Sequence, residues 1–168
     1  VIDPALIWAT YYGGDNSENL WGTVTDNTGN VYVTGETGSI SSIATTGTYD
    51  TAISGYSDAY LAKFSAAGNI LWATYYGGDN GEQGYDVATD GVGNVSITGK
   101  TNSTSGIATS GAYQTSLAGS SGLDDAFLAK FSFSGAIIWG TYYGGAIDEI
   151  SNDVATDASG NAYITGMT

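Results

Sequence analysis

Apolar and polar residues alternate in short runs along the whole chain. The run Val31–Thr34 alternates with a period of two, which is the period of side chains along a strand. Residues 85–89 form a similar short run, and turns rich in glycine separate such runs. No window places apolar residues at positions i, i+3, i+4 and i+7, the spacing of an amphipathic helix. The pattern therefore predicts an all-β chain of short strands joined by tight turns.

Three motifs recur in one fixed order, which indicates an internal repeat. The copies of each motif lie 64 or 67 residues apart. A period of this length predicts one structural unit per repeat. The first motif reads Trp-Ala-Thr-Tyr-Tyr-Gly-Gly at residues 8–14 and 72–78, and with one change at 139–145. The second opens with Asp-x-x-Gly-Asn and spans residues 26–35, 90–99 and 157–166; the third begins Asp-Ala-aromatic-Leu-Ala-Lys-Phe and spans residues 58–65 and 125–132.

Each repeat contains four strand-like runs, here called a to d. Strand a leads through the Asp-x-x-Gly-Asn turn into strand b, and a long segment rich in Ser, Thr and Gly follows. Strand c is the Asp-Ala-aromatic-Leu-Ala-Lys-Phe run, and strand d ends in the Tyr-Tyr-Gly-Gly sequence. Four consecutive antiparallel strands repeated at this period predict a β-propeller blade rather than a solenoid or a sandwich.

The phase of the repeat divides one propeller-repeat domain into four parts. Residues 1–14 are predicted to be a strand d without its own blade, with the strand at Ile7 to Tyr12. Blade 1 covers residues 15–78, blade 2 covers 79–145, and 146–168 form the first half of a further blade. About two and a half repeats cannot close a ring, and open sheet edges pair readily with other strands. We therefore expect the sheets to be completed by other copies of the chain or by further blades of a longer protein.

The motifs resemble those of a known family. The order of the Asp-x-x-Gly-Asn-x-Tyr-x-Thr-Gly, Gly-Ala-Tyr-Gln-Thr, Asp-Ala-Phe-Leu-Ala-Lys-Phe and Trp-x-Thr-Tyr-Tyr-Gly-Gly sequences is similar to that of the bacterial seven-bladed β-propeller (SBBP) repeat, over nearly the whole chain. The resemblance implies a propeller in large secreted or surface-anchored bacterial proteins, often beside adhesion-like or sorting domains. It implies no catalytic residues. The number of repeats departs from the family name.

Composition and charge narrow the function classes. The 168 residues suffice for one domain, and 42% are apolar, which excludes a disordered tail. Seventeen acids against three lysines give a net charge of −14, which disfavours nucleic acid and anionic membranes as partners. No apolar run is long enough to insert into a membrane. The chain contains neither His nor Cys and shows no nucleophile motif, so we predict that it is not an enzyme.

An acidic column follows the Gly-Gly pairs and is the candidate metal site. In a propeller the connections from strand d to strand a lie on one face, so these acids are expected to form a partial ring there. Carboxylates with backbone carbonyls could bind Ca²⁺, the single candidate cofactor. The alternative is that each acid caps backbone N–H groups of its turn, which we favour because the spacing matches no calcium-loop pattern. The column consists of Asp15, Glu18, Asp79, Glu82, Asp148 and Glu149.

The aromatic motif and one loop threonine are further candidates. Trp8, Trp72 and Trp139 could stack on sugar rings, but their return in every repeat favours packing between blades. Thr51 lies in Asp50-Thr51-Ala52, which resembles a short O-glycosylation signal, and an unmodified loop explains it equally well.

These observations favour a non-catalytic structural or adhesive module that is extracellular or at the bacterial cell surface. Its expected partners are copies of itself, assembled by strand sharing into an oligomer or filament, or further blades. The alternative is a lectin-like propeller that binds carbohydrate, with or without Ca²⁺. A third reading, an extracellular hydrolase, requires two carboxylates that face each other in a cleft.

Overall fold

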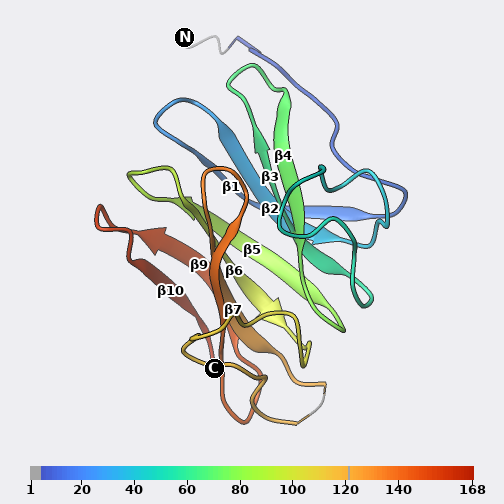
Figure 1. Ribbon diagram of the computed structural model, residues 1–168, viewed down its shortest axis with the longest axis vertical. Coiled ribbons are helices and arrows are strands. Elements are labelled where there is room, and N and C mark those ends of the chain that lie inside the picture. The colour runs from blue at the N-terminus through green and yellow to red at the C-terminus, as the bar shows by residue number, and fades with distance from the viewer. Residues whose placement is uncertain (1–4, 121) are drawn as a thin grey trace.

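All regular structure in the described part of the chain is β-structure, as the sequence predicts (Figure 1). The computed structural model describes residues 5–120 and 122–168. No helix among these residues is long and apolar enough to cross a membrane. The strands form three sheets. The first contains β1 (Glu18–Thr25), β2 (Val31–Thr37), β3 (Asp58–Phe64) and β4 (Ile70–Tyr76); the second contains β5 (Glu82–Thr89), β6 (Val95–Thr101), β7 (Asp125–Phe131) and β8 (Ile137–Tyr143); the third contains β9 (Ile150–Thr156) and β10 (Ala162–Met167).

The two four-stranded sheets are antiparallel meanders with the same register. Thr34 pairs with Leu61 in the first sheet, and Thr98 pairs with Leu128 in the second. The first two strands of each sheet are joined by the predicted Asp-x-x-Gly-Asn turn: Asp26 Oδ1 accepts the N–H groups two and four residues later, at 2.9 and 3.0 Å. The third sheet repeats only the first two strands, β9 and β10. The sheets are therefore propeller-like blades, and they do not close into a ring.

The first strands of the three sheets pack beside one another. Strand β5 contacts both β1 and β9, so these inner strands define the line around which the blades are arranged (Figure 1). Each inner strand carries a β-bulge, at Trp21, Tyr85 and Asn152. A bulge re-aims the side chain of its extra residue.

Aromatic side chains of β4 pack this outer strand onto the next blade. Trp72 of β4 lies over Gly135 in the β7–β8 turn, and its Nε1–H donates to the carbonyl of Phe133 at 3.0 Å. Gly135 has φ = 85°, and a Cβ atom there would lie 3.0 Å from the indole ring. Tyr76 of β4 is fully buried and donates to the carbonyl of Ile107 at 2.8 Å. These contacts confirm the packing reading of the Trp motif.

Residues 5–14 repeat this contact on the first blade. Trp8 lies over Gly68 in the β3–β4 turn, where a Cβ atom would be 2.7 Å from the indole. Tyr12 donates to the carbonyl of Ile43 at 2.9 Å, as Tyr76 does to Ile107. The segment follows the outer edge of the first sheet (Figure 1). It therefore occupies on blade 1 the position that β4 occupies on blade 2.

The predicted strand at Ile7 to Tyr12 is nevertheless not a strand in the structure. Residues 5–14 have no ladder of backbone hydrogen bonds within residues 5–120 and 122–168, because the described chain contains no strand c beside them. Side-chain contacts alone hold this segment on blade 1. Residues 1–4 of the predicted element lie outside the described part.

Substituting Trp72 and Trp8 will show how much each tryptophan contact contributes to the free energy of unfolding. We expect Trp72→Ala to lower the free energy of unfolding by about 3–5 kcal/mol, because the indole is buried between two blades. Trp8→Ala should cost clearly less, since Trp8 is half-buried and its segment has no backbone ladder. Urea denaturation followed by tryptophan fluorescence measures both variants, and equal losses would contradict this account of residues 5–14.

Candidate functional site

The glutamates of the predicted acidic column fasten each Gly-Gly turn to the following blade. Glu82 accepts the N–H of Gly78 at 2.7 Å and the hydroxyl of Thr101 at 2.6 Å. Glu149 accepts the N–H of Gly145 at 2.6 Å. Glu18 accepts the N–H of Gly14 at 3.1 Å and hydroxyl groups at the end of β2. The three side chains have the same role, that of the predicted turn cap.

The aspartates of the column accept hydrogen bonds from residues of the b–c loops. Asp15 accepts the N–H groups of Ile40 and Ser41, at 2.9 and 3.2 Å. Asp79 accepts the hydroxyl of Thr104 and two N–H groups of the same loop, and these hydrogen bonds, led by that hydroxyl, hold its pKa below the ordinary value. Asp148 accepts the N–H of Asp124 at 2.9 Å.

Hydrogen bonding thus occupies the acids proposed as calcium ligands. No group of three His, Cys, Asp or Glu residues within residues 5–120 and 122–168 is close enough to hold a metal ion. The geometry supports turn capping, and calcium binding by this column stays a prediction.

A buried carboxyl pair at the blade junction was missed in the sequence. Asp58 opens β3 and Glu82 opens β5, and both are fully buried. A Cβ atom on Gly77 would lie 2.5 Å from an oxygen of each, so the two groups approach the same point of the turn. Asp58 Oδ2 accepts the N–H of Ser54 at 3.1 Å, while Oδ1 has no partner. Asp125 approaches Gly144 in the same way at the next junction, with its own Oδ1 unpartnered.

The pair at Asp58 is suited to holding a proton rather than to hydrolysis. Burial raises the pKa of Asp58 to about 8, and the negative charge of Glu82 adds to the rise. Both side chains are closed off from solvent, so no substrate could lie between them. This is the geometry of a structural acid, and it lacks the open cleft that the hydrolase reading requires.

The lysines of the third strands reach carboxylates of the a–b turns. Lys130 Nζ lies 3.0 Å from Asp90 and donates to the carbonyl of Gly160 in the next blade at 2.7 Å. Lys63 Nζ lies 3.8 Å from Asp26. Asp157 occupies the equivalent turn of the third sheet, where no lysine among the described residues forms a salt bridge with it. These ion pairs are part of the blade scaffold.

A second cluster lies where the repeats differ from one another. The bulge residues of the inner strands are Trp21, Tyr85 and Asn152, three different side chains at one repeat position. The rings of Trp21 and Tyr85 are 5.2 Å apart and inclined at 71°, and Trp21 is 43% exposed. A scaffold contact must recur in every repeat, whereas a binding residue need not. Departure from the repeat is the sequence signal that would have found this cluster.

Polar groups adjoin this aromatic pair. Tyr85 donates its hydroxyl proton to Gln83 at 2.6 Å, and Gln83 Nε2 donates to Glu36 at 3.0 Å. Burial raises the pKa of Tyr85, and the nearby carboxylates add to the rise against the opposing charge of Lys100. A hollow of about 270 Å³ opens beside these groups. We name the set the axial cluster: Trp21, Glu36, Gln83, Tyr85, Lys100 and Asp124, the last two joined at 2.8 Å.

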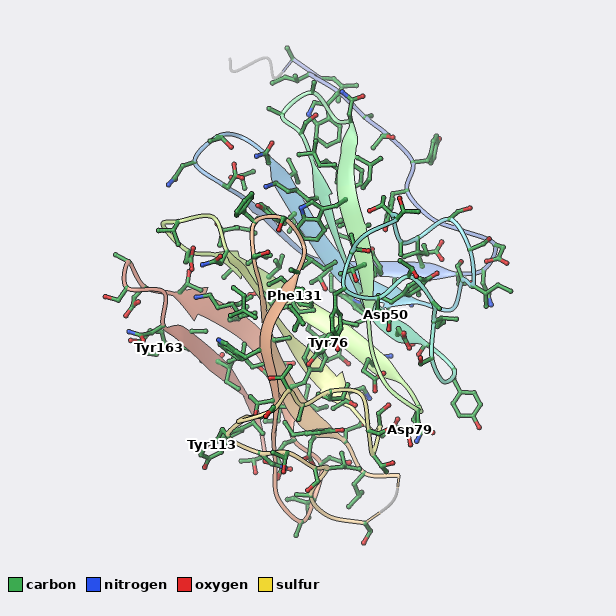
Figure 2. The ribbon with its side chains drawn as sticks, viewed as in Figure 1. Asp50, Tyr76, Asp79, Tyr113, Phe131 and Tyr163 are labelled. Carbon is green, nitrogen blue, oxygen red and sulfur yellow. The ribbon has the colours of Figure 1, made fainter. Side chains whose placement is uncertain are left out.

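A large apolar hollow lies at the end of the second blade. The rings of Tyr113 and Tyr143 stack 6.1 Å apart at 26° along its side. Its volume is about 640 Å³. Figure 2 shows Tyr113 at the outer edge of the molecule, in contrast to Tyr76 at its centre. We name this hollow the end groove; its lining includes Tyr113, Leu128, Trp139, Thr141, Tyr143 and Ile164.

The candidate glycosylation residue is accessible. Thr51 is exposed in the b–c loop of the first blade. The residues on either side of it are joined by a hydrogen bond, in which the N–H of Ala52 donates to Asp50 Oδ1 at 3.0 Å. The loop geometry leaves the hydroxyl open to modification, and the predicted modification itself stays a prediction.

One comparison with known proteins identifies the repeat. The family model for SBBP, described as a beta-propeller repeat, matches residues 138–168. This stretch contains most of β8 and all of β9 and β10, and it confirms the resemblance to the SBBP repeat. No curated protein matches the chain. Residues 72–99 carry the same motifs in the same order, and they fold into the equivalent strands β4, β5 and β6.

The buried acid predicts an unusual pH dependence of stability. The folded pKa of Asp58, about 8, lies above its unfolded value near 4, so the contribution of Asp58 is fully present below pH 4 and is lost as pH rises to about 8. Asp58→Asn cannot ionise, and we expect it to exceed the natural chain in stability at pH 9 by at least about 1 kcal/mol. At pH 4 the two should be similar.

Asp79→Asn is the matched control, because the pKa of Asp79 is lowered and its substitution should cost stability near neutral pH. Urea denaturation at several pH values measures all three proteins. If Asp58→Asn and the natural chain have parallel stability curves, Asp58 does not hold a proton in the fold.

Proposed function

We propose that the chain is a non-catalytic structural module that builds a propeller by stacking its blades against further repeats of the same type. The observation that carries this proposal is the repeated contact between blades. Tyr76 fastens β4 to the second blade, and Tyr12 makes the same contact on the first. A segment that occupies an outer-strand position without its own blade fits a module whose neighbours supply the missing strands.

The acids of this chain support a structural role. Those of the predicted column cap turns and loops, and the pair at Asp58 and Glu82 is buried. Chemistry on a substrate needs a group that the substrate can touch. The chain contains neither His nor Cys, the commonest general base and the strongest side-chain nucleophile.

The proposal includes a location for the module and a class of partners. The acidic surface, with a net charge of −14, favours solubility and repels anionic polymers. Together with the SBBP resemblance, this supports a place outside the cell or at a bacterial surface, in an adhesive or scaffolding protein. The partners are then copies of this chain or further blades, assembled as an oligomer or filament.

A size measurement tests the stacking. We expect the apparent mass in sedimentation velocity to rise above 17.1 kDa as protein concentration increases. Leu20→Asp should suppress the rise, because Leu20 is 54% exposed on β1 at the open side of the first blade. Tyr56→Ala, at an exposed loop position, is the control and should leave the rise unchanged. A compact monomer at all concentrations would contradict assembly between copies.

Carbohydrate binding by the axial cluster is the second candidate function. The exposed face of Trp21 beside hydrogen-bonding groups of Glu36 and Gln83 is the combination that sugar rings require. In a glycan array we expect Trp21→Ala to remove any signal, while Val92→Ala, at an exposed turn position outside this hollow, retains it. The array is run with Ca²⁺ and with a chelator, which tests the calcium dependence. Absence of binding to every sugar in both conditions would exclude this candidate.

A further inference from the structure

Aromatic side chains of strand c fill the space beside the last tyrosine of the preceding blade. Tyr76 of blade 1 lies 5.2 Å from Phe127 and 5.7 Å from Phe131, both on β7 of blade 2. Phe131 also lies 6.0 Å from Tyr49 in the b–c loop of blade 1. Figure 2 shows Tyr76 and Phe131 together at the centre of the molecule. The contact buries both residues completely.

The same arrangement recurs at the start of the chain. Tyr12 stands where Tyr76 stands in the next repeat, and its ring lies 5.6 Å from Tyr60 and 5.5 Å from Phe64 of β3. In both copies, the space beside the tyrosine is therefore filled by the two aromatic residues of a strand c.

The third copy of this space is the end groove. Tyr143 and Tyr113 are the repeat equivalents of Tyr76 and Tyr49. Tyr143 is 54% exposed and Tyr113 is 83% exposed, and the two rings stack on each other. Within residues 5–120 and 122–168, no side chain fills the groove between them as Phe131 does in the preceding copy.

Strand β10 presents a matching backbone edge. In both complete blades the equivalent strand pairs with strand c on its outer side, as β6 does with β7. Strand β10 pairs only with β9 in the described part of the chain. At the turn before β10, Asp157 is the equivalent of Asp90, whose partner is Lys130 of strand c. A single strand placed beside β10 would therefore contact the end groove, the backbone edge of β10 and the carboxylate of Asp157.

We propose that the end groove and the outer edge of β10 form one docking site for an extended strand of the pattern Asp-Ala-aromatic-Leu-Ala-Lys-Phe, the strand c of a further repeat. The register of β6 with β7 places the phenylalanine of this strand opposite Ala162, its lysine opposite Tyr163 and its leucine opposite Thr165. The phenylalanine packs against Tyr113 and Tyr143, and the lysine reaches Asp157. This inference deepens the proposed stacking function and rests on it.

The chemistry of the groove favours a strand over a sugar. Leu128, Trp139 and Ile164 make its walls mainly apolar. An aromatic side chain buries apolar area there, and the free edge of β10 offers backbone donors and acceptors to an extended chain. A sugar would leave most of its hydroxyl groups without partners against such walls.

A peptide with the sequence of residues 124–132, Asp-Asp-Ala-Phe-Leu-Ala-Lys-Phe-Ser, is the probe. We expect saturable binding of the fluorescently labelled peptide to the full chain, measured by anisotropy. Replacing the last phenylalanine of the peptide by alanine should weaken binding at least about tenfold, as loss of a central aromatic anchor does. Replacing its lysine by glutamate should also weaken binding, because the new charge would face Asp157.

Two protein variants locate the site. Tyr143→Ala removes one wall of the groove and should weaken binding by a similar factor. Tyr56→Ala, an exposed tyrosine outside the groove, should bind as the natural chain does, and thermal unfolding confirms that both variants fold. Hydrogen exchange adds a second readout: bound peptide should slow exchange in β10 and leave β4 unchanged.

The outcomes separate this inference from the proposed function. No binding, equal binding by Tyr143→Ala, or protection elsewhere than β10 would overturn the docking site. If the chain nevertheless assembles in sedimentation, the stacking function stands and only its site is wrong. Binding of sugars at the groove, abolished by Tyr143→Ala, would also overturn it in favour of a carbohydrate site.

Discussion

The fold depends on the contact between the aromatic end of one blade and the glycine turn and third strand of the next. A four-stranded sheet of this size has two faces and needs cover on both to bury an apolar core. Trp72 and Tyr76 supply that cover where blade 1 meets blade 2, and the largest buried cluster of the molecule forms there. The contact between blades therefore forms a large part of the apolar core, and each blade needs neighbours.

The Gly-Gly turn determines how one blade leads into the next. Gly77 has no room for a side chain, because the carboxyl groups of Asp58 and Glu82 approach its α-carbon. Glu82 in turn binds the turn backbone and the end of β6, so the turn, strand c and the following blade meet at one buried acid. The glutamates of the acidic column thus connect successive blades. An acid recurs at this position in every repeat because every connection between blades needs one.

Much of this architecture could be predicted from the sequence, because many structural contacts recur from one repeat to the next. The strands, the Asp-x-x-Gly-Asn turns and the packing role of Trp72 were predicted in this way. The burial of Asp58 was not, since it results from the approach of two blades that no local pattern records. The axial cluster was also missed, because Trp21 and Tyr85 occupy one repeat position on neighbouring inner strands and meet through bulges that no local pattern records. The strand predicted at Ile7 to Tyr12 did not form, because a ladder needs a neighbouring strand and none lies beside residues 5–14 within residues 5–120 and 122–168.

Hydrogen exchange of individual amides tests the central claim most directly, because it reports local opening without any substitution. Strands covered on both faces should exchange only through global unfolding, so β5, β6 and β7 are expected to be the slowest. Residues 5–14 and the outer edge of β10 should exchange orders of magnitude faster, since they lack a backbone partner. Exchange in β5 as fast as in β9, which is also paired on one side but packs against a single neighbouring blade, would contradict the claim that packing between blades holds this protein together.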